Sequence, residues 1–412
     1  MKIKHIIRAM VSLLAALLLC ACQDSLYAEE DLLPPTQPGP VLPSADQPFT
    51  YRTGGDTRAH IFERTGRTLY EYEGALYYFP GMGRIPYRYN PETNGQLPFC
   101  SDPLCTHERY TSCRYTDLGN THVIAGAQVL IRRESDSFVQ RPASAVAIDL
   151  KDFSVRTLRE ISGTVSTFGG DVIADQTYFY LNMIYNEQTD KSDFALCRMD
   201  LTTKKSEILA TWPSGEHLTP LFAREDMLYY RDPLDQMILC APIQDPLKTT
   251  PVAQLFDIWY TDLAENCYYS LDRQSGTVYR SDSPQTAEAV FHVEGMDYFY
   301  LTDQHIYYRR VYGQAEEMTF YGETAYHDLH EYYRCDRDGS NPTLIYREEY
   351  ELGSYTYFLK DFIVIGNYLY APWRMQMFDG EINDGKSSDK TINSSLVRID
   401  LESGEWYYIV NE

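Results

Sequence analysis

The stretch His305-Ile306-Tyr307-Tyr308-Arg309 decides the fold, because it is the clearest copy of a segment that recurs along the chain. Each copy is a short run of apolar and tyrosine residues, which favour β-strands. The other copies, of which the second is the weakest, are Leu76–Tyr78, Val129–Ile131, Tyr178–Tyr180, Leu228–Tyr230, Cys267–Tyr269 and Tyr368–Tyr370. The middle residues of successive copies lie 39 to 62 residues apart. Strand-rich repeats with a period of roughly 40–50 residues are typical of propeller blades.

The pattern around each copy indicates a unit of four strands. A first strand precedes the tyrosine segment, and a third strand of the type Leu-x-Arg-x-Asp follows it, as in Leu196–Asp200 and Leu396–Asp400. A tight turn such as Asp338–Asn341 then leads to an outer strand. We therefore predict an all-β protein, a β-propeller with about seven four-stranded blades, with six or eight as alternatives. Closing the ring would remove exposed sheet edges, and Ala59–Glu63 is a candidate to close it near the last strand, Glu405–Val410.

The N-terminus has the pattern of a targeting signal. A basic start precedes Ala9–Ala21, an apolar run shorter than the ~20 residues that span a bilayer and typical of a secretory signal. The run ends in Leu19-Cys20-Ala21-Cys22, which resembles the bacterial lipoprotein signal and so implies lipidation of Cys22; a secreted protein cut nearby is the alternative. We predict a signal peptide over 1–21, a lipid-anchored, Pro-rich, disordered tether over 22–55 and the propeller over 56–412. The lipid would hold the chain on the extracytoplasmic face of the cell membrane.

The net charge and the tyrosine content indicate which classes of binding partner to expect. The formal net charge of −23 argues against nucleic acid and against direct contact with anionic lipids, since both need Lys and Arg. Tyrosine is abundant, with 36 among 412 residues. Its apolar ring and polar hydroxyl suit sheets that are partly in contact with water. We expect most of these rings to be structural and a minority to line a binding surface.

Three cysteines and a histidine stand together between the first two repeats, at Cys100, Cys105, His107 and Cys113. Three thiols and one imidazole are the ligand set of a tetrahedral structural zinc site. A disulfide, which would leave one cysteine over, and a purely structural turn are the alternatives. In each case we expect the segment to hold the long link between two blades in place. The remaining cysteines outside the signal, at Cys197, Cys240, Cys267 and Cys335, lie in the strand pattern and are expected in the core.

Long insertions are expected on one face of the ring. In a four-stranded antiparallel unit, the connection between the second and third strands and the link to the next unit emerge at the same end. The insertions Asn182–Asp193, Tyr312–His330 and Trp373–Asn393 fall there, and we expect loops that carry recognition. The candidate binding residues on them are Tyr321, Tyr326, Trp373, Met375, Met377 and Phe378.

The segment Cys100-Ser101-Asp102-Pro103-Leu104-Cys105-Thr106-His107 resembles part of a group of uncharacterised bacterial β-propeller lipoproteins. The Leu-x-Arg-x-Asp strands with their Gly turns also resemble TolB-like and YWTD-type propellers, although Trp259-Tyr260-Thr261-Asp262 has the first two residues of that motif exchanged. The resemblance implies a propeller on a lipid anchor and brings no activity with it.

Other motifs are weak. Asp336–Ser340 fits a hairpin turn better than a calcium loop, and Asp379–Gly385 has its glycine one place late for an EF-hand. His327 and His330 beside Asp328 fit a solvated loop better than a metal site. Because no catalytic motif is present, we expect a non-catalytic propeller that binds a ligand or an envelope protein. A glycan-active hydrolase or lyase and an envelope assembly scaffold are the alternatives.

Overall fold

The structure is a computed structural model, and every regular element that it describes is a β-strand. Among these residues no helix is long and apolar enough to cross a membrane. The described residues are 61–63, 69–79, 85–100, 102, 104–105, 113, 115, 118–125, 128–133, 142–161, 170–186, 190–232, 234–262, 265–320, 323–348, 355–359, 362–378 and 389–411. The predicted signal peptide, tether and lipidation site at Cys22 lie outside them.

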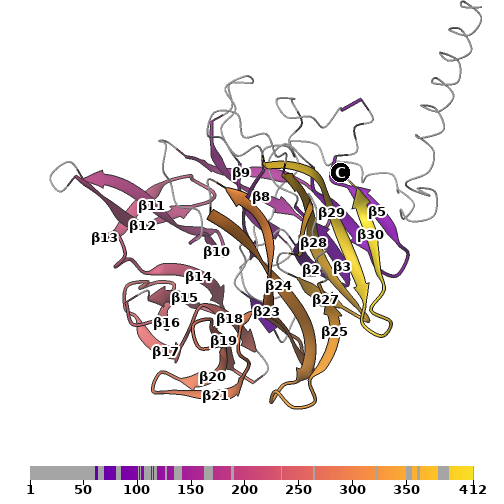
Figure 1. Ribbon diagram of the computed structural model, residues 1–412. Helices are drawn as coiled ribbons and strands as arrows, with labels where there is room; N and C mark the ends of the chain where they lie inside the picture. Colours follow the sequence, from indigo (N-terminus) through magenta and orange to yellow (C-terminus); the bar gives the residue numbers. More distant parts are fainter. Residues whose placement is uncertain are drawn as a thin grey trace, which may run out of the picture.

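The described strands form seven antiparallel sheets, each built mainly from four strands that follow one another in the chain (Figure 1). The first three are β2–β5 (Leu69–Tyr72, Ala75–Tyr78, Tyr87–Asn90, Gly95–Pro98), β6–β9 (Leu118–Ala125, Gln128–Arg133, Ser144–Asp149, Val155–Glu160) and β10–β13 (Val172–Ala174, Thr177–Asn186, Lys191–Asp200, Ser206–Pro213). The next three are β14–β17 (Thr219–Arg224, Met227–Asp232, Met237–Pro242, Thr250–Gln254), β18–β21 (Ile258–Asp262, Cys267–Asp272, Thr277–Ser283, Thr286–His292) and β22–β25 (Met296–Leu301, His305–Phe320, Glu323–Asp336, Thr343–Arg347). The seventh holds β27–β30 (Ile363–Ile365, Tyr368–Phe378, Asp389–Asp400, Trp406–Asn411), with β26 (Tyr355–Leu359) along the far half of β28.

This arrangement confirms the predicted seven-bladed propeller. All seven copies of the repeated segment lie in second strands, namely β3, β7, β11, β15, β19, β23 and β28. The Leu-x-Arg-x-Asp segments lie in third strands, as in β12 and β29. The repeat therefore marks the same place in every blade.

Apolar clusters fill the spaces between blades and hold the ring together. One cluster lies at each of the seven interfaces between neighbouring blades. The interface of the first and second blades is rich in aromatic rings, and Phe99 stacks on Phe153 with 4.1 Å between ring centroids. Fully burying one such side chain stabilises the fold by about 1.5–3 kcal/mol.

Several tyrosines join one blade to the next through the hydroxyl while the ring packs in a cluster. Tyr77 donates to the carbonyl of Leu150 at 3.1 Å, from the first blade to the second. Other tyrosines do the same from the fifth blade to the sixth and from the sixth to the seventh, as Tyr260 Oη–Phe299 O at 2.8 Å and Tyr298 Oη–Phe362 O at 3.2 Å. A phenylalanine at these positions would pack but would leave a buried carbonyl without this donor.

The ring closes by packing of the first blade against the seventh. Leu69 and Ile363 lie in one apolar cluster at this interface. Arg398 of β29 donates to Tyr89 Oη at 3.0 Å and to Asn94 Oδ1 at 2.7 Å. No described strand is exchanged between these two blades, since each takes its four strands from consecutive chain.

The expectation that Ala59–Glu63 closes the ring near the last strand is wrong. The strand β1 (Ile61–Glu63) pairs antiparallel with β18, the first strand of the fifth blade. Three residues without a repeat pattern carry no signal for so distant a partner, which explains the error.

The segment Asp336–Ser340 forms the expected hairpin turn between β24 and β25. Gly339 has a φ of +83°, and a Cβ there would lie 2.4 Å from the Cβ of Phe291. The turn therefore needs glycine for both its backbone and the neighbouring ring. Asp379–Gly385 lies outside the described residues.

Candidate functional site

The strand order gives the ring two different faces. We call the one with the turns between second and third strands and the links between blades the hairpin face, and the other the turn face. On the hairpin face, β11 with β12, β23 with β24, and β28 with β29 continue as long hairpins, and β11 and β12 extend well outward in Figure 1. The described residues of the insertions expected as loops are thus largely in strands, because their backbone groups continue to pair across the hairpin.

The predicted binding residues belong to two of these hairpins. Tyr326 lies in β24 opposite Glu316, and the candidates from Trp373 to Phe378 lie in β28. There Trp373 is opposite Ser395, and Met375 is opposite Asn393. Tyr321 falls outside the described residues. The candidates therefore come from adjacent blades at the hairpin face.

The thiols of Cys100, Cys105 and Cys113 come together in the link between the first and second blades. Their sulfur atoms all lie within 4.8 Å of one another, and we call them the thiol cluster. A local turn helps, since the Asp102 side chain accepts from the Leu104 N–H at 2.9 Å and the Asp102 carbonyl accepts from the Cys105 N–H at 3.1 Å. His107 lies outside the described residues.

The surroundings of the thiol cluster are apolar. Cys100 and Cys113 are buried among the aromatic residues of this interface, and Cys105 packs against them half-buried. Burial raises the pKa of Cys113 to about 12 and also raises the pKa of Cys100. A cation would reverse this preference by stabilising thiolates. Around zinc, sulfur atoms at ~2.3 Å from the metal lie about 3.8 Å apart, so the cluster needs only a small contraction.

The other cysteines behave as expected core residues, with one exception. Cys197, Cys267 and Cys335 are buried in strands, whereas Cys240 is half-buried. The four lie in β12, β16, β19 and β24. They are free thiols and pack as small apolar side chains.

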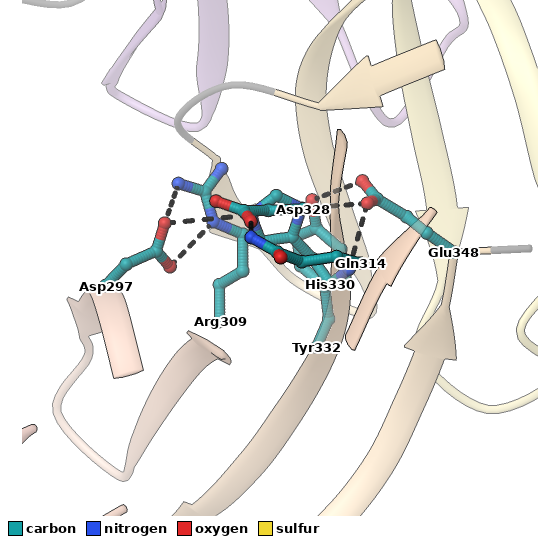
Figure 2. A network of polar contacts seen from close by, with 7 residues as sticks. All are labelled: Asp297, Arg309, Gln314, Asp328, His330, Tyr332 and Glu348. Atoms are coloured by element: carbon teal, nitrogen blue, oxygen red, sulfur yellow. Dashed lines mark hydrogen bonds and ion pairs between the residues drawn. The ribbon is translucent and has the colours of Figure 1, made fainter. Parts of the chain in front are cut away.

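A second group of polar side chains lies at the base of the β23–β24 hairpin (Figure 2). Arg309 donates to both oxygens of Asp297, from Nε at 2.9 Å and from Nη2 at 2.6 Å. The ring of His330 lies between two carboxylates, with Nδ1 2.8 Å from Glu348 Oε2 and Nε2 3.8 Å from Asp297 Oδ2. Tyr332 donates to Glu348 Oε1 at 3.2 Å. We call these five residues the sixth-blade network.

The network holds the ring of His330 in one orientation. Glu348 Oε2 also accepts the backbone N–H of His330 at 3.0 Å. Nδ1 of the ring therefore points toward Glu348, and Nε2 faces Asp297. Burial would lower the pKa of Arg309, but Tyr332 and Asp297 hold that pKa above its usual value. The side chain of Asp297 is 32% exposed, so it is the member that solvent reaches most readily.

Sequence reasoning found only a part of this network. His330 was expected in a solvated loop, but it is buried in β24. Asp297, Arg309, Tyr332 and Glu348 were missed. Charged residues inside apolar strands were the available signal, but their convergence comes from four separate strands or strand ends.

The opposite side of the sixth blade carries a buried acid. Glu331 is fully buried and accepts from Arg310 Nε at 2.8 Å, from Tyr333 Oη at 2.9 Å and from Arg347. Burial opposes its charge, but Arg310, Tyr333 and Arg347 hold the pKa of Glu331 below its usual value. The sixth blade thus holds carboxylates on both of its surfaces.

Another acidic group, Asp262, Glu265 and Cys267, lies at the turn face. Arg337 Nη2 forms an ion pair with Asp262 Oδ2 at 2.6 Å, and Arg280 Nη2 lies 3.6 Å from Glu265 Oε2. Because the chain supplies these cations itself, this group is a weaker metal candidate than the thiol cluster.

Comparisons with known proteins found no matching family model and no matching curated protein. Among solved structures, a candidate 6-phosphogluconolactonase from Bacteroides uniformis is 13% identical, with a TM-score of 0.37, over 82% of this chain and 96% of that chain. A puromycin-hydrolyzing peptidase from Mycobacterium tuberculosis is 10% identical (TM-score 0.40; 88% and 56% covered). An oligogalacturonate lyase from Vibrio parahaemolyticus is 8% identical (TM-score 0.26; 82% and 74% covered). Matches at this level carry no conclusion about activity, and the propeller class rests on the strand topology itself.

Proposed function

We propose that this protein is a lipoprotein anchored through Cys22 to the extracytoplasmic face of the cell membrane, and that its propeller binds a ligand or protein partner at the hairpin face. The long hairpins that leave the same face of a closed ring carry this proposal. They extend the rigid blades outward and bring aromatic and methionine residues of two neighbouring blades to one side.

Binding fits the sixth-blade network better than catalysis does. Both of its carboxylates are held by donors of the chain, Asp297 by Arg309 and Glu348 by His330 and Tyr332. Such groups are held in position by their hydrogen bonds, which suits recognition of a polar ligand. A general acid or base instead needs to exchange its proton with the substrate.

A binding assay with matched variants tests the proposal. The full chain, solubilised in detergent, would be screened on glycan arrays and in crosslinking pull-downs from the cell envelope. The variant Trp373→Ala/Met375→Ala/Phe378→Ala should lose the captured partner. The control Ile208→Ala/Leu344→Ala, which removes exposed apolar side chains of the outer strands β13 and β25, should retain it. Glycan turnover abolished by Asp297→Asn would instead support the hydrolase or lyase alternative and reject non-catalytic binding.

We propose in addition that the thiol cluster and His107 hold a structural zinc ion that staples the first two blades. Three converging thiols in an apolar setting support zinc over a disulfide, which would leave one thiol unused. Elemental analysis of the purified chain, together with a thiol count, tests it. One zinc per chain, lost in Cys105→Ser but retained in Cys240→Ser, supports the site. A bonded cysteine pair without metal rejects it.

A further inference from the structure

The N-terminal strand β1 lies on the inner edge of a blade. In the fifth sheet the strand order is β1-β18-β19-β20-β21, so β1 pairs with the edge of β18 that faces away from β19. First strands of blades surround the central channel of a propeller. The residues Ile61–Glu63 therefore lie on the channel side of the fifth blade, which is not a neighbour of the first blade.

The direction of β1 follows from its register. The strand β18 begins at the hairpin face, where the link from the fourth blade arrives, and ends at the turn face, where it turns into β19. Because β1 is antiparallel to it, Ile61 pairs with Asp262 near the turn face and Glu63 pairs with Tyr260 farther in. The strand thus runs toward the hairpin face, where β2 begins the first blade.

We infer that the tether leaves the ring from the centre of the turn face, so that the hairpin face points away from the membrane. This inference rests on the proposed lipid anchor at Cys22. The 39 residues from 22 to 60 span at most about 140 Å when fully extended. Their point of departure favours the orientation in which the turn face lies on the side of the lipid. A partner that approaches from outside the cell would then meet the long hairpins first, and the channel beneath them holds β1.

A crosslink tests where β1 lies, independently of any lipid. Phe62 and Thr261 are directly opposite in the register, and directly opposite residues of antiparallel strands are close enough for a disulfide. After mild oxidation of the full chain in detergent, peptide mapping should find Phe62→Cys joined to Thr261→Cys. The control pairs Phe62→Cys with Val364→Cys in β27, the first strand of the seventh blade. A bond in the control, or in neither variant, overturns the placement.

A second experiment measures the orientation. Thr202 and Gln274 are both exposed. They occupy equivalent turn positions, since each backbone N–H donates at 3.0 Å to the aspartate two residues before it. Thr202 lies on the turn face, whereas Gln274 lies on the hairpin face. A donor dye would be attached at either residue through an unnatural amino acid, with an acceptor lipid in phosphatidylcholine vesicles. Energy transfer should be stronger from Thr202. Equal transfer, or stronger transfer from Gln274, overturns the orientation.

An artificial anchor separates this inference from the proposed lipidation. A six-histidine tag at position 22 would attach the mature chain to vesicles that contain a nickel-chelating lipid. If the native chain fails to bind vesicles but the tagged chain shows the stronger transfer from Thr202, the lipid anchor is wrong and the orientation stands. If both chains bind and the order is reversed, the orientation is wrong and the anchor stands.

Discussion

The first and sixth blades solve the same packing problem with different chemistry. Between the first and second blades, Phe99, Phe153 and Tyr115 fill the space with aromatic rings, and Tyr115 donates to the Phe153 carbonyl at 2.7 Å. The sixth blade also buries tyrosines, but it adds Glu331 on one surface and the sixth-blade network on the other.

The comparison between the two blades concerns the buried charges of the sixth blade. At the first interface, aromatic packing and tyrosine hydroxyls join the two blades beside the thiol cluster. Buried charges are weak evidence for stability, because their desolvation opposes the attraction between them. They are concentrated in the blade whose described hairpin is the longest, at the face where we propose that a partner binds. The following substitutions test this contrast between an apolar interface and a charged blade.

The largest effect is expected at the aromatic interface. Phe99→Ala removes a fully buried ring that stacks on Phe153 and contacts Tyr77 and Tyr115. Such substitutions cost about 3–5 kcal/mol through lost burial and the cavity left behind. Urea unfolding followed by tyrosine fluorescence would measure it. Leu234→Ala, at a side chain that is 66% exposed, is the control and should change the free energy of unfolding very little. A comparable loss in both would contradict the role of the interface.

A smaller loss is expected from the buried charge. Glu331→Gln keeps the shape but leaves Arg310 and Arg347 without their carboxylate. Both arginines reach solvent, so the loss should be about 1–3 kcal/mol, below the range for a fully buried pair. Glu207→Gln breaks the exposed pair with Arg198 and should cost less than about 1 kcal/mol. Equal effects would show that burial of Glu331 is unimportant.

The ionisation of Glu331 should also make the stability of the fold depend on pH. Its pKa is lower in the folded chain than the ordinary value of 4.5, so its ionised form stabilises the fold above that pH. This contribution is lost as the pH falls below about 4.5. Thermal unfolding of the native chain between pH 6 and pH 3 should therefore show a steeper loss than that of Glu331→Gln. Parallel curves would place the acid sensitivity elsewhere.

The smallest effect is expected from one hydroxyl of the sixth-blade network. Tyr332→Phe removes the donor to Glu348 and should cost about 1 kcal/mol. Tyr230→Phe removes a buried donor to the Pro246 carbonyl in the fourth blade and should cost a similar amount. If only Tyr332→Phe also weakens binding of the partner captured at the hairpin face, the network serves recognition. An unchanged affinity in both would make it structural.

The blades could be predicted because their signals are local. Each tyrosine segment and each Leu-x-Arg-x-Asp strand is a pattern of only a few consecutive residues. The place of each segment in its blade follows from the order of the segments along the chain. The thiols of Cys100, Cys105 and Cys113 could also be predicted as neighbours, since few residues separate them.

Features that depend on distant pairing could not be predicted. The strand β1 has three residues, and its partner β18 begins almost two hundred residues later. The sequence predicts loops in place of the hairpins because their polar residues break the apolar alternation, although their backbones pair. Asp297 and Glu348 come to lie on either side of His330 because β22 begins and β25 ends at the hairpin face.

A crystal structure of the full chain in detergent would show whether the seven blades close into one ring. We expect seven sheets in one ring, with Leu69 and Ile363 in one apolar cluster where the first and seventh blades meet and with β1 on the inner edge of β18. An open arc, a different number of blades, or a strand shared between the first and last blades would contradict it.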